Sequence, residues 1–345
     1  MLDPSASLTD RPGSKPAIIR GDMLIHKSNK FRLPLPLRKS LICFSVCGLL
    51  ISAIARVAAA DTITISVGID PAFSPVYIAQ ERGLFAKAGL DVKLLRVAQG
   101  GEAMDAIIAG QAQLGVAADQ TVILRLARAD LRPLAILHDS EDYLQAVARS
   151  GIDEPSQVKK MGVVKGTVSE YCAAMFAEKY GLESALKYVN ATGPEFVALL
   201  LRGDIDAFFS WPPFPAMAMK QGARGLATNG KVGYLSTMWV TASPTWLASN
   251  EAVAHKLLDV LAEANRQMEA DLPAAAADFQ KQTKLAASDT LPLFGLLRFH
   301  LRDFSDPDIQ SFDKIAEFQF SRKSSPAKVD VPHFLARGFY VDRSR

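Results

Sequence analysis

Short apolar runs rich in β-branched residues alternate along the chain with stretches in which apolar residues recur at helical spacing. The first series begins just after residue 61 and predicts strands at 62–68, 90–98, 112–118 and 132–139. Helices are expected between these strands at 74–83, 101–109 and 119–129. Alternation of this kind is typical of a parallel sheet with helices on both faces, so the predicted fold class is α/β.

A second series of the same kind predicts strands at 159–166, 185–191 and 204–210, with helices at 169–180 and 194–202. Its glycines repeat those of the first series at a nearly constant offset. Gly101 and Gly193 are 92 positions apart, and Gly110 and Gly203 are 93 apart. This spacing indicates two lobes built on one plan, whereas chance alignment of common glycines is the alternative. We assign residues 61–146 to the first part of lobe 1 and residues 147–242 to lobe 2.

The strand pattern fades after residue 242, and helical spacing takes over. Residues 250–272 place apolar side chains on one face of a helix, and further helices are expected at 274–286 and 307–320. A lobe of about 90 residues has a modest core of its own. We therefore expect residues 243–345 to form a helical return that packs on lobe 1.

The N-terminal region has the pattern of a secretory signal peptide. Residues 27–39 hold five basic and no acidic side chains, and the fifteen residues 41–55 are uncharged. Ala58 and Ala60 are the small residues expected around a cleavage site. The apolar run is shorter than the roughly 20 residues that a spanning helix needs. Residues 1–60 are thus predicted to be an N-terminal extension and signal peptide, cleaved near Ala60, and the protein to be periplasmic. A retained anchor, which would tether a sensory domain, is the alternative.

The charge balance changes once the signal peptide is set aside. Nine of the 39 Lys and Arg residues, and three of the 36 Asp and Glu residues, lie in residues 1–60, which leaves 30 basic against 33 acidic side chains. Nothing in this balance favours nucleic acid as a partner. Cys172 is the one cysteine beyond residue 60, so the exported chain can form no internal disulfide.

Motifs for chemistry are missing from the sequence. The stretch 225–232 comes close to a phosphate-binding loop but ends in Val232, which has no oxygen for a metal ion. The sequence holds no serine-nucleophile elbow, zinc-binding H-E-x-x-H or C-x-x-C motif. We therefore predict no catalytic residue, no cofactor and no metal site, and a protein that is not an enzyme.

The loops that follow the strands are the candidate binding site. Ligands of open α/β sheets bind outside the carboxyl ends of the strands, where the first N–H groups of helices are unpaired. Thr167 and Ser169 suit a tight turn into a helix whose first amides face a ligand. Asp119 occupies a similar place, although capping of its own helix explains an aspartate there equally well.

The most unusual loop follows the strand at 204–210. In "AFFSWPPFPAM" (207–217), Phe208 belongs to a buried strand, and the prolines that follow cannot take part in a sheet ladder. Pro212 and Pro213 restrict the backbone, so we expect Trp211 and Phe214 to form a rigid aromatic wall of a ligand pocket.

Four stretches resemble a known family: 74–95, 106–120, 166–171 and 206–218. They are similar to the extracytoplasmic solute-binding proteins of ABC importers for nitrate, sulfonates, taurine and thiamine precursors, the SsuA/THI5-like and NMT1-like group. The resemblance implies the type II periplasmic-binding-protein fold, in which two α/β lobes are joined by a two-segment hinge and enclose the ligand in a cleft. The hinge segments would lie near 143–150 and 234–243.

The resemblance also implies a partner and a set of ligand-binding residues. The partner is the transmembrane permease of an ABC importer, and the binding protein itself is expected to be a monomer. Carried over to this sequence, the expected small-molecule ligand contacts are Asp70, Phe73, Asp119, Gln120, Thr167, Ser169, Trp211 and Phe214.

The ligand class follows less directly. Family members often have an acidic residue where this chain has Pro212, and Lys165 is the single basic residue in the predicted cleft loops. These features favour a planar neutral, zwitterionic or cationic solute, with a sulfonate-like or nitrate-like anion as the alternative. A thiamine-pyrimidine-synthase-like enzyme is a further alternative, but Cys172 alone cannot supply the cysteine-rich motif of that enzyme.

Overall fold

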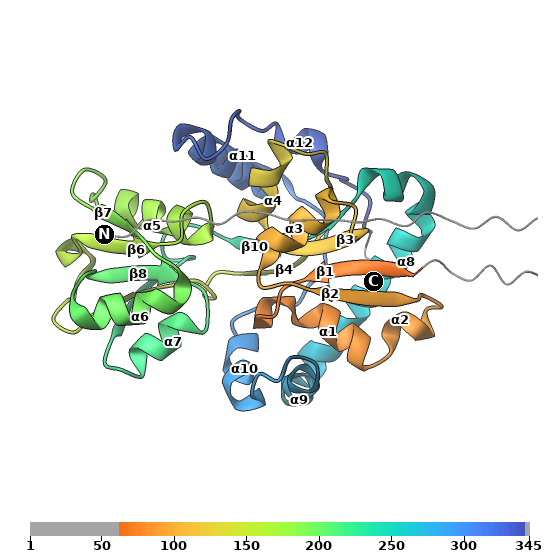
Figure 1. Ribbon diagram of the computed structural model, residues 1–345, viewed down its shortest axis with the longest axis horizontal. Helices are drawn as coiled ribbons and strands as arrows, with labels where there is room; N and C mark the ends of the chain where they lie inside the picture. Colours follow the sequence, from red (N-terminus) through yellow and green to blue (C-terminus); the bar gives the residue numbers. More distant parts are fainter. Residues whose placement is uncertain (1–61, 342–345) are drawn as a thin grey trace, which may run out of the picture. The chain divides into compact units, whose positions relative to one another are not determined.

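The computed structural model describes residues 62–341, and these residues form two five-stranded mixed sheets with helices packed around them (Figure 1). The first sheet contains β1 (Ile63–Val67), β2 (Val92–Arg96), β3 (Leu114–Ala118), β4 (Arg132–Ser140) and β10 (Ser236–Ala242). The second contains β5 (Gln145–Ala148), β6 (Lys160–Val163), β7 (Lys187–Asn190), β8 (Ala207–Ser210) and β9 (Arg224–Thr228). The predicted α/β architecture with two lobes is confirmed. The first lobe holds the first sheet, and the second lobe holds the second sheet.

The two sheets share one strand plan. Their orders are β2-β1-β3-β10-β4 and β7-β6-β8-β5-β9. In each sheet the first three strands are parallel and the fourth is antiparallel to its neighbours. The glycines that repeat in the sequence also have matching roles, since Gly110 and Gly203 follow helices with φ of 70° and 77°. Only glycine adopts that left-handed conformation without strain, which explains why the repeat is visible in the sequence.

The antiparallel strand of each sheet comes from the other half of the chain. β5 follows β4 directly along the chain but is hydrogen-bonded between β8 and β9. β10 follows the second series but is hydrogen-bonded between β3 and β4. The end of lobe 2 is expected at residue 242 from the sequence, whereas the pairing of β10 puts Ser236–Ala242 in the first sheet. Trp239 of this strand is fully buried against Phe304 and Phe312, so its packing also lies with the first lobe.

Buried polar contacts join the two segments through which the chain passes between the sheets. Asn229 is fully buried, and its Nδ2 donates to the carbonyls of Ser140 (2.7 Å) and Tyr234 (2.9 Å). Its Oδ1 accepts from the Leu144 amide at 3.1 Å. One side chain therefore fixes residues of both crossovers, and all its polar atoms are satisfied despite burial.

The helices fall into two groups. The first lobe has α1 (Ser74–Glu81), α2 (Leu84–Lys87), α3 (Gly100–Ile108), α4 (Asp119–Leu126), α8 (Pro244–Ala270), α9 (Leu272–Thr283), α10 (Ala287–Phe294), α11 (Asp306–Ser321) and α12 (Val331–Phe334). The second lobe has α5 (Val168–Lys179), α6 (Gly193–Arg202) and α7 (Phe214–Met219). In Figure 1, α5 covers one face of the second sheet while α6 and α7 cover the other.

The C-terminal helices are tied to the first lobe by specific polar contacts. Arg82 Nε lies 2.9 Å from Asp278 Oδ2, and Asn265 Nδ2 donates to the Leu137 carbonyl at 2.7 Å. Arg302 connects β4 with α11, because its guanidinium contacts both Asp139 and Asp308. Arg82, Leu137 and Asp139 each lie more than a hundred positions before their C-terminal partners. These contacts therefore hold the C-terminal helices against the first lobe.

No helix within residues 62–341 has the length and apolar character required to cross a membrane. The predicted signal peptide and its cleavage position lie outside the described residues.

Candidate functional site

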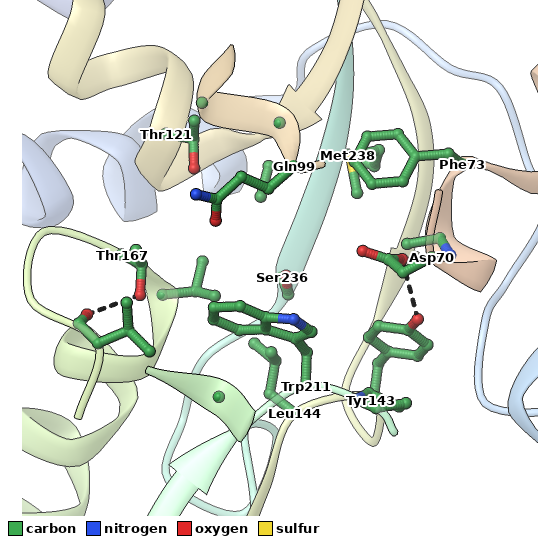
Figure 2. Close-up of a pocket in the computed structure, with 18 of the residues that line it drawn as sticks. Asp70, Phe73, Gln99, Thr121, Tyr143, Leu144, Thr167, Trp211, Ser236 and Met238 are labelled. Carbon is green, nitrogen blue, oxygen red and sulfur yellow. Dashed lines mark hydrogen bonds between the residues drawn. The ribbon is translucent and has the colours of Figure 1, made fainter. Parts of the chain in front are cut away.

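A cavity of about 790 Å³ lies between loops of the two lobes. Its lining combines the loops after β1, β2 and β3 of the first lobe with those after β6, β7 and β8 of the second. Tyr143 and Leu144 of the first crossover, residues of β4 and β10, and Leu297 complete it. Figure 2 shows the lining residues Asp70, Phe73, Gln99, Thr121, Tyr143, Leu144, Thr167, Trp211, Ser236 and Met238 around this space. The loops that follow parallel strands thus meet at one site, as the sheet topology predicts.

Five of the eight residues expected to contact a ligand line this cavity: Asp70, Phe73, Thr167, Trp211 and Phe214. They come from the loop after β1, the start of α5, and the turn between β8 and α7. The structure therefore brings residues from both halves of the sequence to one place.

Asp119, Gln120 and Ser169 are not part of the cavity lining, so the expectation for these three side chains is corrected. Asp119 is fully buried and accepts hydrogen bonds from the Tyr234 hydroxyl and from Thr237, whose Oγ1 lies at 2.9 Å. These contacts satisfy the carboxylate inside the protein. The capping interpretation that competed with ligand contact is also wrong, because Ala118 is the N-cap of α4 and Asp119 is its first residue, whose Oδ1 accepts the Gln120 amide at 2.6 Å.

The other two side chains are also held by internal partners. The side-chain amide of Gln319 donates to both the backbone carbonyl and the Oε1 of Gln120, at 2.7 and 2.9 Å. Ser169 Oγ donates to the Phe209 carbonyl at 2.5 Å and accepts from the Val164 amide at 3.0 Å. Ser169 therefore connects the start of α5 to β6 and β8, which is a structural role.

Two aromatic rings of the lining lie directly over glycine backbones. A Cβ atom on Gly68 would be 2.4 Å from Cε2 of Phe73, and one on Gly193 would be 2.2 Å from Cε2 of Phe214. No side chain other than hydrogen fits at either position without displacing the ring. Trp211 packs edge-on against Phe214, with ring centroids 6.5 Å apart and planes at 69°.

The neighbouring Phe208 belongs to the core. Its ring is fully buried and stacks on Phe196 at 4.8 Å. This placement confirms the expected division of "AFFSWPPFPAM" into a buried strand and an aromatic turn beside the cavity.

Asp70 is the acidic group of the lining. Its Oδ1 accepts from the Ala72 amide at 2.8 Å and from the Tyr143 hydroxyl at 3.2 Å (Figure 2). Burial outweighs these two hydrogen bonds and raises the pKa of the Asp70 carboxyl to about 6. The same burial, together with the Asp70 charge, raises the pKa of Tyr143 well above its usual value, so the phenol remains a hydrogen-bond donor.

Among the helices that begin at the cavity, α3, α5 and α6 share one feature. Each has a glutamate in its first turn that accepts a hydrogen bond from the backbone N–H of a residue preceding the helix. The pairs are Glu102 with Ala98 (2.9 Å), Glu170 with Gly166 (2.8 Å) and Glu195 with Thr192 (2.7 Å). Part of the positive potential of these helix N-termini is thus balanced within the protein.

Several lining residues were not predicted from the sequence. Gln99 and Gly100 follow β2, a loop with the same topological position as those that were considered. Ser236 and Met238 lie on β10, which reaches the site because it crosses into the first sheet. Arg125 was also missed because it lies inside α4, and Asp105 contacts its guanidinium at 3.2 Å.

The chain is similar to known proteins both in sequence and in structure. The chain is 24% identical over 296 residues to a Bacillus subtilis (strain 168) protein named for aliphatic sulfonate binding, with 80% of this chain and 86% of the relative covered. The periplasmic aliphatic sulphonate binding protein SsuA of Escherichia coli has a similar structure, with a TM-score of 0.72 at 17% identity, covering 79% of this chain and 96% of SsuA. The alkanesulfonate-binding protein SsuA of Xanthomonas axonopodis pv. citri, bound to MOPS, gives a TM-score of 0.68 at 17% identity, covering 79% and 97%.

These structural likenesses establish the periplasmic-binding-protein fold. The family model described as NMT1/THI5 like matches residues 70–275, which include every strand of the two sheets except β1 and all the cavity-lining residues except Leu297. The chain belongs to the NMT1/THI5-like family.

Proposed function

We propose that this protein is the extracytoplasmic substrate-binding component of an ABC importer, which captures a small organic solute in the cavity and delivers it to a membrane permease. The observation that carries the proposal is the cavity itself, because its lining comes from loops of both lobes, from the first crossover and from β10. A relative named for sulfonate binding, similar over most of both chains, supports the same role.

The walls of the cavity favour a solute with a flat portion. Trp211, Phe214 and Phe73 contribute aromatic surface, and binding sites for small molecules combine such surface with few polar groups. We propose a planar or heterocyclic solute that packs on Trp211. An oxyanion group such as a sulfonate is the second ligand class, since the N–H groups of Gly100 and Gly101 at the start of α3 could donate hydrogen bonds to its oxygens.

The mode of action that we propose is closure of the lobes over the solute. On the strand assignments, residues 62–140 and 236–341 move as one body and residues 145–228 as the other. Closure gains contacts to the solute from both bodies at once, which shifts the population toward the closed form. We propose that the exported protein works as a monomer.

We propose that the solute leaves the protein chemically unchanged. Burial raises the pKa of the Cys172 thiol well above its usual value, so the thiol remains protonated and is a poor nucleophile. Cys172 is also fully buried away from the cavity lining.

Native mass spectrometry of the protein as purified from its periplasmic source tests the proposal. The expected result is a small organic molecule retained with one copy per chain, released by denaturation with unchanged mass. Once identified, that solute should bind the unmodified protein in a one-to-one titration. Its affinity should be lower for Trp211→Ala. A solute whose affinity is unaffected by Trp211→Ala would contradict the assignment of the cavity as the binding site.

A further inference from the structure

We propose that the Asp70 end of the cavity is a subsite for a nitrogen-bearing group of the solute, either an ammonium or an N–H donor. This inference rests on the proposed function, since it concerns the solute that the cavity captures. It goes beyond a sulfonate ligand, because it requires a hydrogen-bond donor on the solute at the end of the cavity formed by Asp70, His138 and Tyr143.

The carboxyl group of Asp70 has one oxygen in use and one available. Oδ1 accepts from the Ala72 amide and the Tyr143 hydroxyl, whereas Oδ2 makes no hydrogen bond within residues 62–341. Figure 2 shows an Asp70 oxygen directed toward the space between Met238 and Trp211. A solute lying on Trp211 would therefore meet a carboxylate oxygen whose hydrogen-bonding capacity is unfilled.

His138 fixes the backbone beside Asp70 at the same end of the cavity. Its Nε2 lies 2.7 Å from the Ala72 carbonyl, which accepts only a proton-bearing nitrogen, so Nδ1 is the bare nitrogen of the neutral ring. Nδ1 has no hydrogen-bond partner in the described part of the chain, although His138 is only 3% exposed and lines the cavity. Asp70 and His138 thus hold the N–H and the C=O of Ala72, and this fixes the Asp70 carboxylate at one end of the cavity.

Charges elsewhere around the cavity also favour a solute with a nitrogen-bearing group. Three of the helices that begin at the cavity, α3, α5 and α6, each carry a first-turn glutamate, at positions 102, 170 and 195. Of the basic side chains in the lining, Arg125 contacts Asp105, and Lys165 is exposed. A solute that bears only negative charge would gain little from these groups, whereas one with a cationic nitrogen gains from Asp70.

The ionisation of Asp70 gives the subsite a pH signature. The titratable groups around it are Tyr143, which donates to it, His138, and Tyr77, which its charge affects. Burial raises the pKa of Asp70 to about 6 and lowers that of His138 to about 4, while both tyrosines have raised pKa values. Asp70 is therefore the group of this set that changes charge between pH 5 and 7, and an ammonium should bind more tightly above about pH 6.

Matched pairs of aromatic ligands test the subsite by isothermal titration calorimetry on the full exported chain. In each pair a ring carries a para-aminomethyl or a para-ethyl group, which are similar in size but differ in charge. Three head groups complete the set: sulfonate, carboxylate and hydroxymethyl. The variants are Asp70→Asn, which keeps an acceptor for Ala72 and Tyr143, and Asp130→Asn, which removes the same charge from an exposed position outside the lining.

The expected result is that the aminomethyl member of a pair binds the unmodified protein and Asp130→Asn about tenfold more tightly than the ethyl member at pH 7.5. Asp70→Asn should abolish this preference, and lowering the pH to 5 should reduce it in the unmodified protein. Equal affinities within every pair, or a preference that survives Asp70→Asn, would overturn the subsite.

The head groups separate this inference from the ligand classes of the proposed function. An aminomethyl preference that is lost in Asp70→Asn, seen only with carboxylate or hydroxymethyl head groups, would support the subsite and exclude sulfonates. Binding of both sulfonates without any amine preference would support sulfonate capture and overturn the subsite. If no ligand of the set bound at millimolar concentration, the subsite as a determinant of affinity would be rejected, while native mass spectrometry would still decide whether the protein retains a solute.

Discussion

The ring of Phe214 lies so close to Gly193 that a Cβ atom on residue 193 would be 2.2 Å from Cε2 of the ring. This contact joins the start of α6 to the turn after β8, and both residues line the cavity. The position of the aromatic wall therefore depends on the absence of a side chain at residue 193.

Gly193→Ala should displace the Phe214 ring into the cavity. We expect a loss of stability of about 1–3 kcal/mol, typical of overpacking, and weaker binding of a solute that packs on Trp211. Urea unfolding and ligand titration measure the two effects. Gly225→Ala is the matched control, because a Cβ at residue 225 would meet no atom within 4 Å. If Gly193→Ala behaves like this control, the ring is not fixed by the contact.

Trp211→Ala should weaken solute binding by at least about tenfold, which corresponds to about 1.4 kcal/mol. The reason is the loss of aromatic surface at the cavity wall, where Trp211 is half-buried and packs on Phe214. Trp246→Ala, on α8 and away from the lining, controls for the loss of a tryptophan. A titration curve that is the same for Trp211→Ala and the unmodified protein would remove Trp211 from the site.

Asp119→Ala should affect stability far more than binding. It leaves the Tyr234 hydroxyl and the Thr237 donors unpaired in the interior, which costs about 2–4 kcal/mol. The solute affinity of the folded variant should change less than about threefold, since Asp119 does not line the cavity. A large loss of affinity with stability preserved would return Asp119 to the binding site.

The stability effect of Asp70→Asn should depend on pH. The pKa of Asp70 is raised to about 6 in the folded protein from 3.8, so the native state holds a proton that the unfolded state releases between about pH 4 and 6. Stability from this group is therefore present at low pH and is lost as pH rises to about 6. The free energy of unfolding of Asp70→Asn, taken relative to that of the unmodified protein, should be about 2 kcal/mol higher at pH 7 than at pH 4.

Urea unfolding of both proteins at the two pH values measures this difference directly. The comparison of two proteins is needed because the lowered pKa of His138 acts in the opposite direction over the same range. A pH-independent difference between the variant and the unmodified protein would show that the Asp70 carboxyl is not perturbed.

Much of the fold could be predicted because periodicity and glycine position report local backbone geometry. The long helix predicted at 250–272 is part of α8, and the glycines at 110 and 203 end helices with positive φ. The strands β5 (QAVA) and β9 (RGLAT) were not predicted, since each holds a single β-branched residue and no aromatic one. The exchange of β10 into the first sheet depends on pairing between distant segments, which local pattern does not encode.

The candidate site could likewise be predicted only in part. Loops after parallel strands could be predicted as its location, and Trp211 stood out because two prolines follow it directly in the sequence. The direction of individual side chains could not be predicted. Asp119 and Ser169 turn toward internal partners, whereas Ser236 reaches the cavity only because of strand exchange.

A crystal structure of the protein with its retained solute tests the central claim most directly. The account predicts a solute between the lobes that contacts Trp211 of the second lobe and Asp70 of the first within one cavity. A solute bound to one lobe alone, or at a surface away from Trp211, would contradict it.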